Sequence, residues 1–407
     1  MLALVLLVGS IVLRATEAYA RVSTLQVDKN DSGCSDNGSG TATRPFCSIG
    51  AAATQVTAGQ TVRVSRGRYR EQLWLASSGT ATAPIKFIAE RGETVRLTGG
   101  SDGSGVYTNG KAYVTVQGFT VSDTTGDGIV VSENSSHVTV RGNRVTNAGQ
   151  PVLGLTAKGI RVDRANDNVI ANNTVDHNTD YGIYVVGNST RNLVTGNRVY
   201  ANARVYERAA SGIRVHGAAG NTILRNVSHD NEDSGIELVT GASNNLVVNS
   251  IVYNNNDHGI DDTGRSPNNA VIGNVVYKSV TAGINFEGGA TSGQIFNNIA
   301  VDNGLNSPRT HGNIRVDSTS TTGTTLDYNL LYLSSPGRNY VWGVGYDTLQ
   351  QMQMASGQEA HAIEGHYVLG LARSRIEDQA LRHRGPLAEG SGRSDDSTVQ
   401  LQDEGAP

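Results

Sequence analysis

Five acidic side chains occupy two short segments of the sequence that lie 24 residues apart. Asp233 and Glu237 belong to DSGIEL, and Asp257, Asp261 and Asp262 belong to DHGIDD. Carboxylates that lie close together either raise one another's pKa, which suits general acid–base chemistry, or share a divalent cation. Because calcium takes carboxylate oxygens as ligands, the sequence predicts a Ca²⁺ site formed by these five residues. The alternative is that Asp233 and Asp257 only cap turns.

His258 and two arginines are the candidates for proton transfer beside these carboxylates. His258 is adjacent to Asp257, Arg214 precedes Glu237 by one repeat, and Arg309 follows in a later loop. An arginine base needs strong activation, because its pKa lies above about 12. The alternative for His258 is a ligand or hydrogen-bonding role, and the alternative for Arg214 is a salt bridge with Glu237.

A repeat must position these residues. Gly-Ile-x-(Val/Leu/Phe) recurs from residues 128, 159, 182, 212, 235 and 283, with GIDD at 259, and a second marker, usually Asn, stands at 143, 173, 197, 226, 250, 274 and 298. The intervening segments alternate Val, Ile and Tyr with polar residues and show no helical period, which predicts short strands. Several strands per repeat describe a coil of a parallel β-helix, in which equivalent residues stack about 4.8 Å apart. We interpret the Asn markers as a structural ladder of stacked amides.

The period of two along a strand assigns the faces of each repeat. The Ile and Val positions of Gly-Ile-x-Val-x face inward, and the x positions, which include Tyr184, Asn285 and Glu287, face outward. Asp262 falls at an inward position. We expect it to tip outward at the strand end and to join the cation ligands.

Two longer insertions are predicted to form the walls of a trough around the acidic repeats. The loop before Gly212 contains Tyr206 and Arg208, and the loop before Gly312 contains Arg309. Together with Tyr184, Asn285 and Glu287, these side chains are expected to bind an anionic sugar. The simpler interpretation is that exposed loops are polar and tolerate insertions.

The repeats resemble the right-handed parallel β-helix proteins of the pectate-lyase-like superfamily over roughly residues 25–370. The resemblance implies an all-β fold, a single right-handed parallel β-helix with a short N-terminal helical cap. The acidic corner is similar to that of the calcium-dependent pectate lyases: Asp233, Asp257 and Asp261 match three of their calcium ligands, and Asn285 stands where those enzymes have a lysine base.

From this resemblance we predict a calcium-dependent lyase that cleaves a uronic-acid-containing polysaccharide by β-elimination. Two alternatives stay open, because one scaffold carries several functions. One is a glycoside hydrolase that uses paired carboxylates. The other is a non-catalytic protein that binds carbohydrate or acts at the cell surface.

The ends of the chain and its composition complete the sequence-based expectations. Residues 1–20 contain an apolar run too short to span a bilayer and a small-x-small site, which predicts a signal peptide, secretion and no membrane contact after cleavage. In an exported chain Cys34 and Cys47 are expected to form a disulfide, with two free thiols as the alternative. The predicted organisation is a cap with the first coils over 21–100, repeats over 101–335, a closing segment over 336–375 and a disordered tail over 376–407. The net charge of −4 argues against a nucleic-acid partner, and we expect a monomer.

Overall fold

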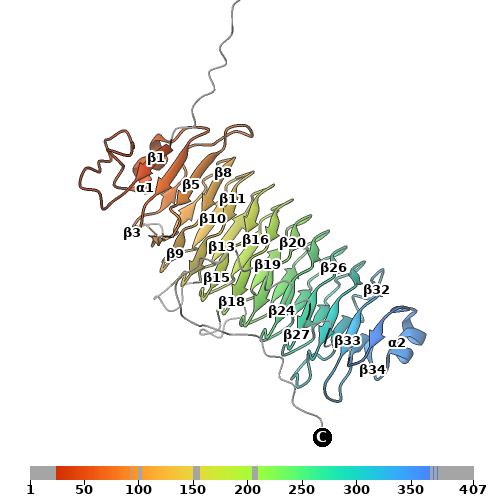
Figure 1. The fold of residues 1–407 in the computed structure, drawn as a ribbon. Coiled ribbons are helices and arrows are strands. Elements are labelled where there is room, and N and C mark those ends of the chain that lie inside the picture. Colours follow the sequence, from red (N-terminus) through yellow and green to blue (C-terminus); the bar gives the residue numbers. More distant parts are fainter. Residues whose placement is uncertain are drawn as a thin grey trace, which may run out of the picture.

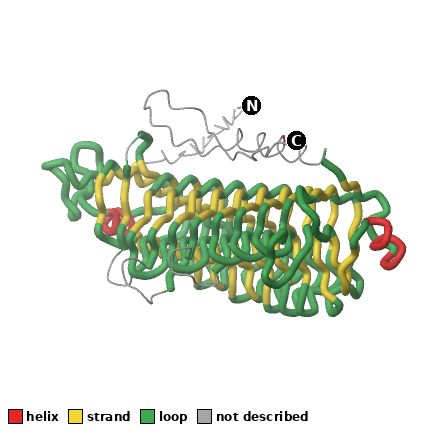
Figure 2. Tube along the Cα trace, turned by 90° about the horizontal axis from the view of Figure 1, so that it is seen from below, coloured by secondary structure: helices red, strands yellow, loops and turns green. Residues whose placement is uncertain are grey.

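The chain winds into an elongated solenoid whose coils stack along one axis (Figure 1). The computed structural model describes residues 24–92, 94–99, 103–149, 156–203, 210–366, 370 and 374. Strands and loops dominate these residues, and one helix lies near each end of the solenoid (Figure 2). The predicted signal peptide and the predicted tail over 376–407 lie outside the described residues.

Three parallel sheets run the length of the solenoid, and each complete coil contributes a strand to each sheet. Sheet 1 consists, in spatial order, of β1 (Thr24–Val27), β2 (Thr61–Val64), β5 (Ile85–Ala89), β8 (Val114–Gln117), β11 (Thr139–Arg141), β14 (Val169–Ala171), β17 (Leu193–Thr195), β20 (Thr222–Leu224), β23 (Leu246–Val248), β26 (Ala270–Ile272), β29 (Gln294–Phe296) and β32 (Thr325–Asp327).

Sheet 2 carries the predicted site. It consists of β4 (Leu73–Trp74), β7 (Val106–Tyr107), β10 (Ile129–Ser132), β13 (Ile160–Asp163), β16 (Ile183–Val186), β19 (Ile213–His216), β22 (Ile236–Val239), β25 (Ile260–Asp262), β28 (Ile284–Phe286), β31 (Ile314–Asp317) and β34 (Tyr340–Tyr346).

Sheet 3 follows the corner that contains the Asn markers. It consists of β3 (Gly67–Tyr69), β6 (Val95–Leu97), β9 (Thr120–Ser122), β12 (Arg144–Thr146), β15 (Thr174–Asp176), β18 (Arg198–Tyr200), β21 (Val227–His229), β24 (Ile251–Tyr253), β27 (Val275–Tyr277), β30 (Ile299–Val301), β33 (Leu330–Tyr332) and β35 (Ile363–Glu364).

The interior is filled by β-branched and aliphatic side chains that stack from coil to coil. The isoleucine of each Gly-Ile repeat pairs with its equivalent in the next coil, as Ile236 does with Ile260 and Ile260 with Ile284. These side chains are fully buried in one continuous core. Because the coil interior is narrow, small branched residues fill it better than aromatic rings.

Asparagine ladders stabilise the corners, as the sequence predicts for one of them. Asn197 donates through its amide to Oδ1 of Asn226 in the next coil and to the carbonyl of Ile170 in the preceding coil, at 3.0 and 2.8 Å. The residue before each ladder position adopts a left-handed conformation, for example Arg225 at φ 54°. The ladder therefore satisfies the polar groups of a turn that the sheets cannot reach.

Two further ladders, beyond the one that the Asn markers predict, lie five residues before and after the first. One runs through Asn168, Asn192, Asn221, Asn245 and Asn269, and the other includes Asn178, Asn202, Asn231 and Asn255. An Asn-x₄-Asn-x₄-Asn spacing is their signal in the sequence.

The glycine of the repeat is required by close packing at a corner. A Cβ atom at Gly235 would lie 2.3 Å from Val252 Cγ1 and 2.6 Å from Asn255 Nδ2. Contacts this short do not occur between real atoms, so any larger residue would separate the corner from the adjacent strand.

Both ends of the solenoid are covered. Helix α1 (Ile49–Gln55) packs Ile49, Ala52 and Ala53 inward, with Ser48 as its N-cap, and α2 (Leu349–Ser356) buries Met352 at the other end. The Cys34–Cys47 disulfide is present, as predicted. No helix among the described residues is long and apolar enough to cross a membrane.

Candidate active site

Adjacent strands of sheet 2 stack the outward side chains that the sequence places 24 residues apart. Glu237 pairs in register with Asp261, Asp261 with Asn285, and Asn285 with Arg315. The alignment of β22 with β25 also places Asp233, three residues before β22, one coil from Asp257. The predicted stacking of the two acidic segments is therefore confirmed.

We call Asp233, Glu237, Asp257, His258 and Asp261 the acid pocket. Burial, together with the neighbouring carboxylates of Glu237 and Asp257, raises the pKa of Asp233 to about 6. Burial likewise raises the pKa of Glu237, with Asp261 adding to the effect while Arg214 opposes it. The pKa of Asp261 is raised well above its ordinary value, mainly by burial. Like charges held this closely favour protonation or a bound cation.

Asp257 differs from its neighbours because three groups stabilise its ionised form. Burial opposes ionisation, but His258, a 2.6 Å hydrogen bond from Thr281 Oγ1 and an ion pair with Arg309 together lower its pKa. The Arg309 side chain is 60% exposed and reaches the pocket from the loop before Gly312. That loop therefore contributes one wall of the site.

His258 lies between Asp257 and Asp261 and is almost completely buried. Its Nδ1 is 3.4 Å from Asp257 Oδ1 and 3.9 Å from Asp261 Oδ2, and Nδ1 has no hydrogen-bond partner within the described protein. Its Nε2 lies 3.0 Å from Thr310 Oγ1. Burial lowers the pKa of His258, which favours the neutral imidazole.

Arg214 stands one coil before Glu237 and bonds to it, as the alternative interpretation of this residue requires. Its Nη1 lies 3.0 Å from Glu237 Oε2 and donates a 2.8 Å hydrogen bond to the Tyr181 hydroxyl, while the guanidinium sits over the Tyr181 ring. Ser211 Oγ donates to the same Glu237 oxygen at 2.6 Å. Arg214 is thus held in place rather than free.

On the other side of the pocket, Asn285 links Asp261 to a third arginine. Asn285 Nδ2 donates to Asp261 Oδ1 at 2.7 Å, and its Oδ1 accepts from Arg315 Nη1 at 2.6 Å. The same Nη1 donates to Glu287 Oε2 at 2.6 Å. Arg315 is absent from the predicted site, although Ile314-Arg315-Val316-Asp317 repeats the pattern of Ile160-Arg161-Val162-Asp163.

Aromatic side chains extend the column toward the preceding coils. Tyr184 pairs with Arg214, stacks on Tyr181 with ring centroids 5.0 Å apart, and its hydroxyl lies 2.9 Å from His216 Nδ1. Burial raises the pKa of Tyr181 to about 12. Stacked rings beside cations are a surface on which sugar rings can lie. Tyr206 and Arg208 lie outside the described residues.

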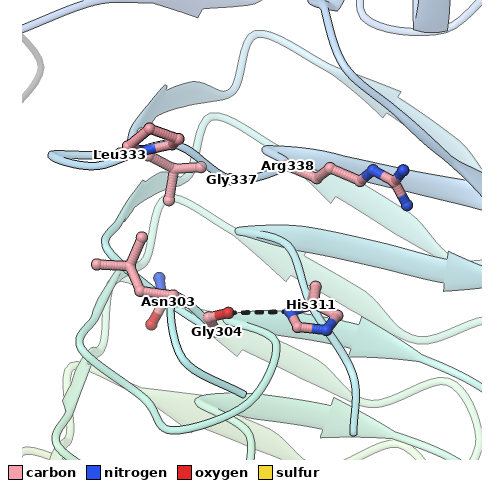
Figure 3. A pocket seen from close by; sticks show the side chains of 8 residues that line it. Asn303, Gly304, His311, Leu333, Gly337 and Arg338 are labelled. Atoms are coloured by element: carbon pink, nitrogen blue, oxygen red, sulfur yellow. Dashed lines mark hydrogen bonds between the residues drawn. The ribbon is translucent and has the colours of Figure 1, made fainter. Parts of the chain in front are cut away.

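A cavity continues the same corner toward the C-terminal end. It has a volume of about 280 Å³ and lies between the loops after β30 and β33 (Figure 3). Its lining consists of Asn303, Gly304, Leu305, His311, Leu333, Pro336, Gly337 and Arg338. His311 precedes β31 and Arg338 precedes β34 in the way that Asp257 precedes β25. The cavity is therefore two to three coils, about 10–14 Å, from the acid pocket.

Comparison with known families identifies the solenoid. The family model described as Pel9A-like, right handed beta helix region matches residues 30–330. The chain belongs to this family. The predicted fold class is thereby confirmed, including its handedness.

Individual relatives share little sequence identity with this Pel9A-like protein. A stretch of 219 residues is 27% identical to the uncharacterized protein YwoF of Bacillus subtilis (strain 168), and it covers 50% of this chain and 42% of that protein. The chain thus spans less than half of that curated relative. A rhamnogalacturonan lyase has a similar structure at 15% identity with a TM-score of 0.56, covering 79% of this chain and 84% of that one. The pectate lyase Pel9A is similar at 18% identity with a TM-score of 0.53, covering 80% and 79%. At these identities the structural likeness concerns the fold alone.

The predicted role of Asp262 is wrong, because its side chain lies inside the solenoid. Asp262 aligns with the core residues Leu238 and Phe286 and is fully buried. Both of its oxygens accept from Asn269 Nδ2 at 3.1 Å. Asn269 ends the second ladder, since the residue 24 positions later is Gly293, where Phe286 fills the space. Asp262 therefore supplies the acceptor that the next ladder amide would have supplied, and it cannot also bind a cation outside.

The remaining predicted calcium ligands have suitable chemistry but other partners. In the described part of the chain, no group of three or more His, Cys, Asp or Glu side chains is arranged to hold a metal ion. Asp257 contacts Arg309 and Thr281, and Asp261 contacts Asn285. Carboxylate oxygens are nevertheless the ligands that calcium prefers.

Proposed function

We propose that this Pel9A-like protein is a secreted polysaccharide lyase that cleaves a uronic-acid-containing chain by β-elimination at the acid pocket. The observation that carries the proposal is the acid pocket itself: four stacked carboxylates flanked by Arg214, Arg309 and Arg315, on the sheet of a pectate-lyase-like solenoid. Three carboxylates with raised pKa values are unfavourable for stability, and such clusters concentrate at functional sites. The disulfide supports export.

The arginines are proposed to bind the acidic polymer. Arg309 is the most available of them, because its guanidinium is largely exposed and its only carboxylate partner in the described structure lies in the pocket. Exchange of Asp257 for the carboxylate of a uronate would keep the charge of Arg309 paired and would open the pocket. The stacked Tyr181 and Tyr184 rings and the cavity beside His311 are then proposed as positions for further sugar units along the solenoid axis.

We propose His258 as the base that removes the C5 proton. If Nε2 donates to Thr310, the Nδ1 lone pair is free to accept a proton. The imidazolium formed in this way would be stabilised by the Asp257 and Asp261 carboxylates at 3.4 and 3.9 Å. The electrons of the broken C–H bond form the C4–C5 double bond, and the glycosidic oxygen at C4 leaves with the electrons of the C4–O bond and takes a proton from water.

Calcium is proposed separately as the cation of the acid pocket. Asp233, Glu237, Asp257 and Asp261 would hold it once Arg309 and Asn285 release their carboxylates. Bound there, the ion would neutralise the uronate carboxylate and acidify its C5 proton.

The test is an assay on polygalacturonate, alginate and glycosaminoglycans, with calcium or with a chelator. A lyase releases products with the ultraviolet absorbance of an unsaturated uronate. His258→Gln should abolish this signal, and Asp167→Asn, which alters an exposed pair with Arg191 in the corner that precedes sheet 1, should not. Absence of unsaturated product from every acidic polymer would refute the lyase proposal, and retained activity in His258→Gln would refute the assignment of the base. Equal activity with calcium and with chelator would refute the metal.

One observation favours a hydrolase as the second candidate. Asp233 has a raised pKa and Asp257 a lowered pKa, and such a divergence between neighbouring carboxyls is typical of an acid and a base. A hydrolase releases reducing ends without unsaturated product. Binding of the polymer without either product would instead indicate a carbohydrate-binding protein.

A further inference from the structure

The cavity between the loops after β30 and β33 is lined by both polar and apolar side chains (Figure 3). His311 and Arg338 are the polar side chains that can contact a ligand, and Leu305, Leu333 and Pro336 are the apolar ones. Within the described part of the chain, no aspartate or glutamate belongs to this lining. The chemistry of the ligand can therefore be derived from what each of these groups offers.

The hydrogen bond of His311 determines what its ring offers. Its Nδ1 lies 3.2 Å from the carbonyl oxygen of Gly304. Because a carbonyl oxygen only accepts, Nδ1 carries the proton, and in the neutral imidazole Nε2 is then an acceptor. A hydroxyl group of the ligand is a suitable donor to Nε2.

Arg338 offers a cation that is only weakly occupied by another residue. Its Nε lies 3.3 Å from Asp347 Oδ1, and the two side chains are 53% and 76% exposed. Ion pairs this exposed contribute little net free energy. A guanidinium also has five N–H donors, so it can bind a second carboxylate beside Asp347 or in its place.

A sugar acid satisfies all of these groups with a single unit. The C–H face of its ring packs on the leucines and the proline, a hydroxyl donates to His311, and its carboxylate accepts from Arg338. A neutral sugar lacks the partner for Arg338, and an inorganic anion lacks the apolar face. The cavity volume of about 280 Å³ is at the lower end of the range of about 300–1,000 Å³ for small-molecule sites, which suits one unit rather than several.

The loop between β30 and β31 connects this cavity with the acid pocket. His311 lines the cavity, while the preceding Thr310 lies 3.0 Å through Oγ1 from His258 Nε2, and Arg309 pairs with Asp257. Three consecutive side chains thus contact both places. With about one sugar unit per coil spacing of about 4.8 Å, a polymer along the solenoid axis would place the unit in the cavity two or three units from the unit in the acid pocket.

We propose that the cavity is a binding site for one uronate unit, in which Arg338 binds the carboxylate and His311 Nε2 accepts from a hydroxyl group. Asp347 competes with that carboxylate for Arg338. The inference rests on the proposed function, because it takes the acidic polymer as the ligand. The site that it names can nevertheless be tested without any cleavage.

The test is an NMR titration of the full chain with isotope-labelled histidines. The probes are the methyl glycosides of galacturonate, glucuronate and mannuronate, and the methyl glycosides of galactose, glucose and mannose are the matched neutral sugars. A uronate should shift the ring signals of His311, which His311→Gln identifies by their loss. It should bind at least about tenfold more tightly than its neutral counterpart, because only the uronate has a charged partner for Arg338.

Two substitutions at one ion pair should change this affinity in opposite directions. Arg338→Gln should weaken the binding of the uronate about tenfold and remove the preference over the neutral sugar. Asp347→Asn removes the competing carboxylate and should tighten the binding about two- to fivefold. Asp167→Asn, which alters another exposed ion pair, is the matched control and should leave the affinity unchanged.

Three results would overturn the inference. The first is a shift of His258 signals by the uronates while those of His311 stay unmoved, and the second is equal affinity for a uronate and its neutral counterpart. The third is unchanged uronate binding in Arg338→Gln. Binding at His311 in a chain that cleaves no acidic polymer would support this site and remove only the lyase proposal, whereas cleavage without binding at His311 would do the reverse.

Discussion

Ser250 interrupts the first asparagine ladder, and replacing it by asparagine should stabilise the solenoid. In the next coil the Asn274 amide donates to the carbonyl of Val247 and to Asn298 Oδ1, at 3.0 and 3.1 Å. Serine has no amide group, so the two corresponding bonds cannot form at 250. Asn226 donates its backbone N–H to Ser250 Oγ at 3.2 Å, and an Asn at 250 would also accept from the Asn226 side chain.

The expected gain follows from these three hydrogen bonds. A buried hydrogen bond contributes about 0.5–1.5 kcal/mol net, and fixing one Asn side chain costs part of the gain, so Ser250→Asn should raise the free energy of unfolding by about 1–3 kcal/mol. The backbone already suits asparagine: Asn249 has φ 51°, close to the 56° of Asn297 before the intact ladder position 298.

The assay is denaturant unfolding of the full chain, together with hydrogen exchange of the strands on either side of the ladder. Asn274→Ser is the matched reverse change and should lower stability by a similar amount. If Ser250→Asn leaves the unfolding midpoint unchanged while Asn274→Ser lowers it, the ladder bonds do not add coil by coil, and the argument from the repeat geometry fails.

Four further results are expected. Burial raises the pKa of Glu359, which accepts a hydrogen bond from the Asn329 side-chain amide, to about 7. The protonated carboxyl therefore makes its full contribution to the free energy of unfolding below about pH 4.5, and this contribution of about 3 kcal/mol is lost as the pH rises through 7. Glu359→Gln should remove this pH dependence from the unfolding midpoint. Asp262→Asn should raise the melting temperature, since it removes a buried acid whose pKa is raised by burial and keeps an acceptor for the Asn269 amide, and it should leave calcium titrations unchanged. Arg309→Gln should weaken the salt-dependent binding of an acidic polysaccharide with little change in melting temperature. Reduction of Cys34–Cys47 should destabilise the N-terminal cap by about 3 kcal/mol, seen as faster proteolysis there.

Each of these expectations can fail on its own. Parallel pH profiles for the unmodified chain and Glu359→Gln would show that this carboxyl titrates normally. Weaker calcium binding in Asp262→Asn would place that side chain in the metal site after all. An Arg309→Gln variant that binds the polymer as tightly as before, at low and at high salt, would remove this arginine from the substrate site. Unchanged proteolysis after reduction would mean that the cap is held by α1 and its neighbours alone.

The sequence determines the solenoid because the fold is built from short-range repetition. A glycine, an inward isoleucine and an asparagine recur at nearly constant spacing, and each has a local reason: a corner without room for Cβ, a narrow core, and a turn with unsatisfied polar groups. The same spacing is sufficient to predict that Glu237 stacks on Asp261. The disulfide follows equally from composition and from the expectation of export.

Only the tertiary structure decides which partner each polar side chain takes. Asp262 keeps the inward direction of its strand position, and its partner there is Asn269, which Gly293, 31 positions away from Asp262, leaves without the next ladder acceptor. Arg315 enters the site because β31 continues the column after an insertion that hides the repeat. The spacing of such side chains, and their inward or outward direction, follow from the repeat and from the period of two along a strand. Their partners depend on which buried donor or acceptor the neighbouring coil leaves unsatisfied, and that is a property of the assembled solenoid.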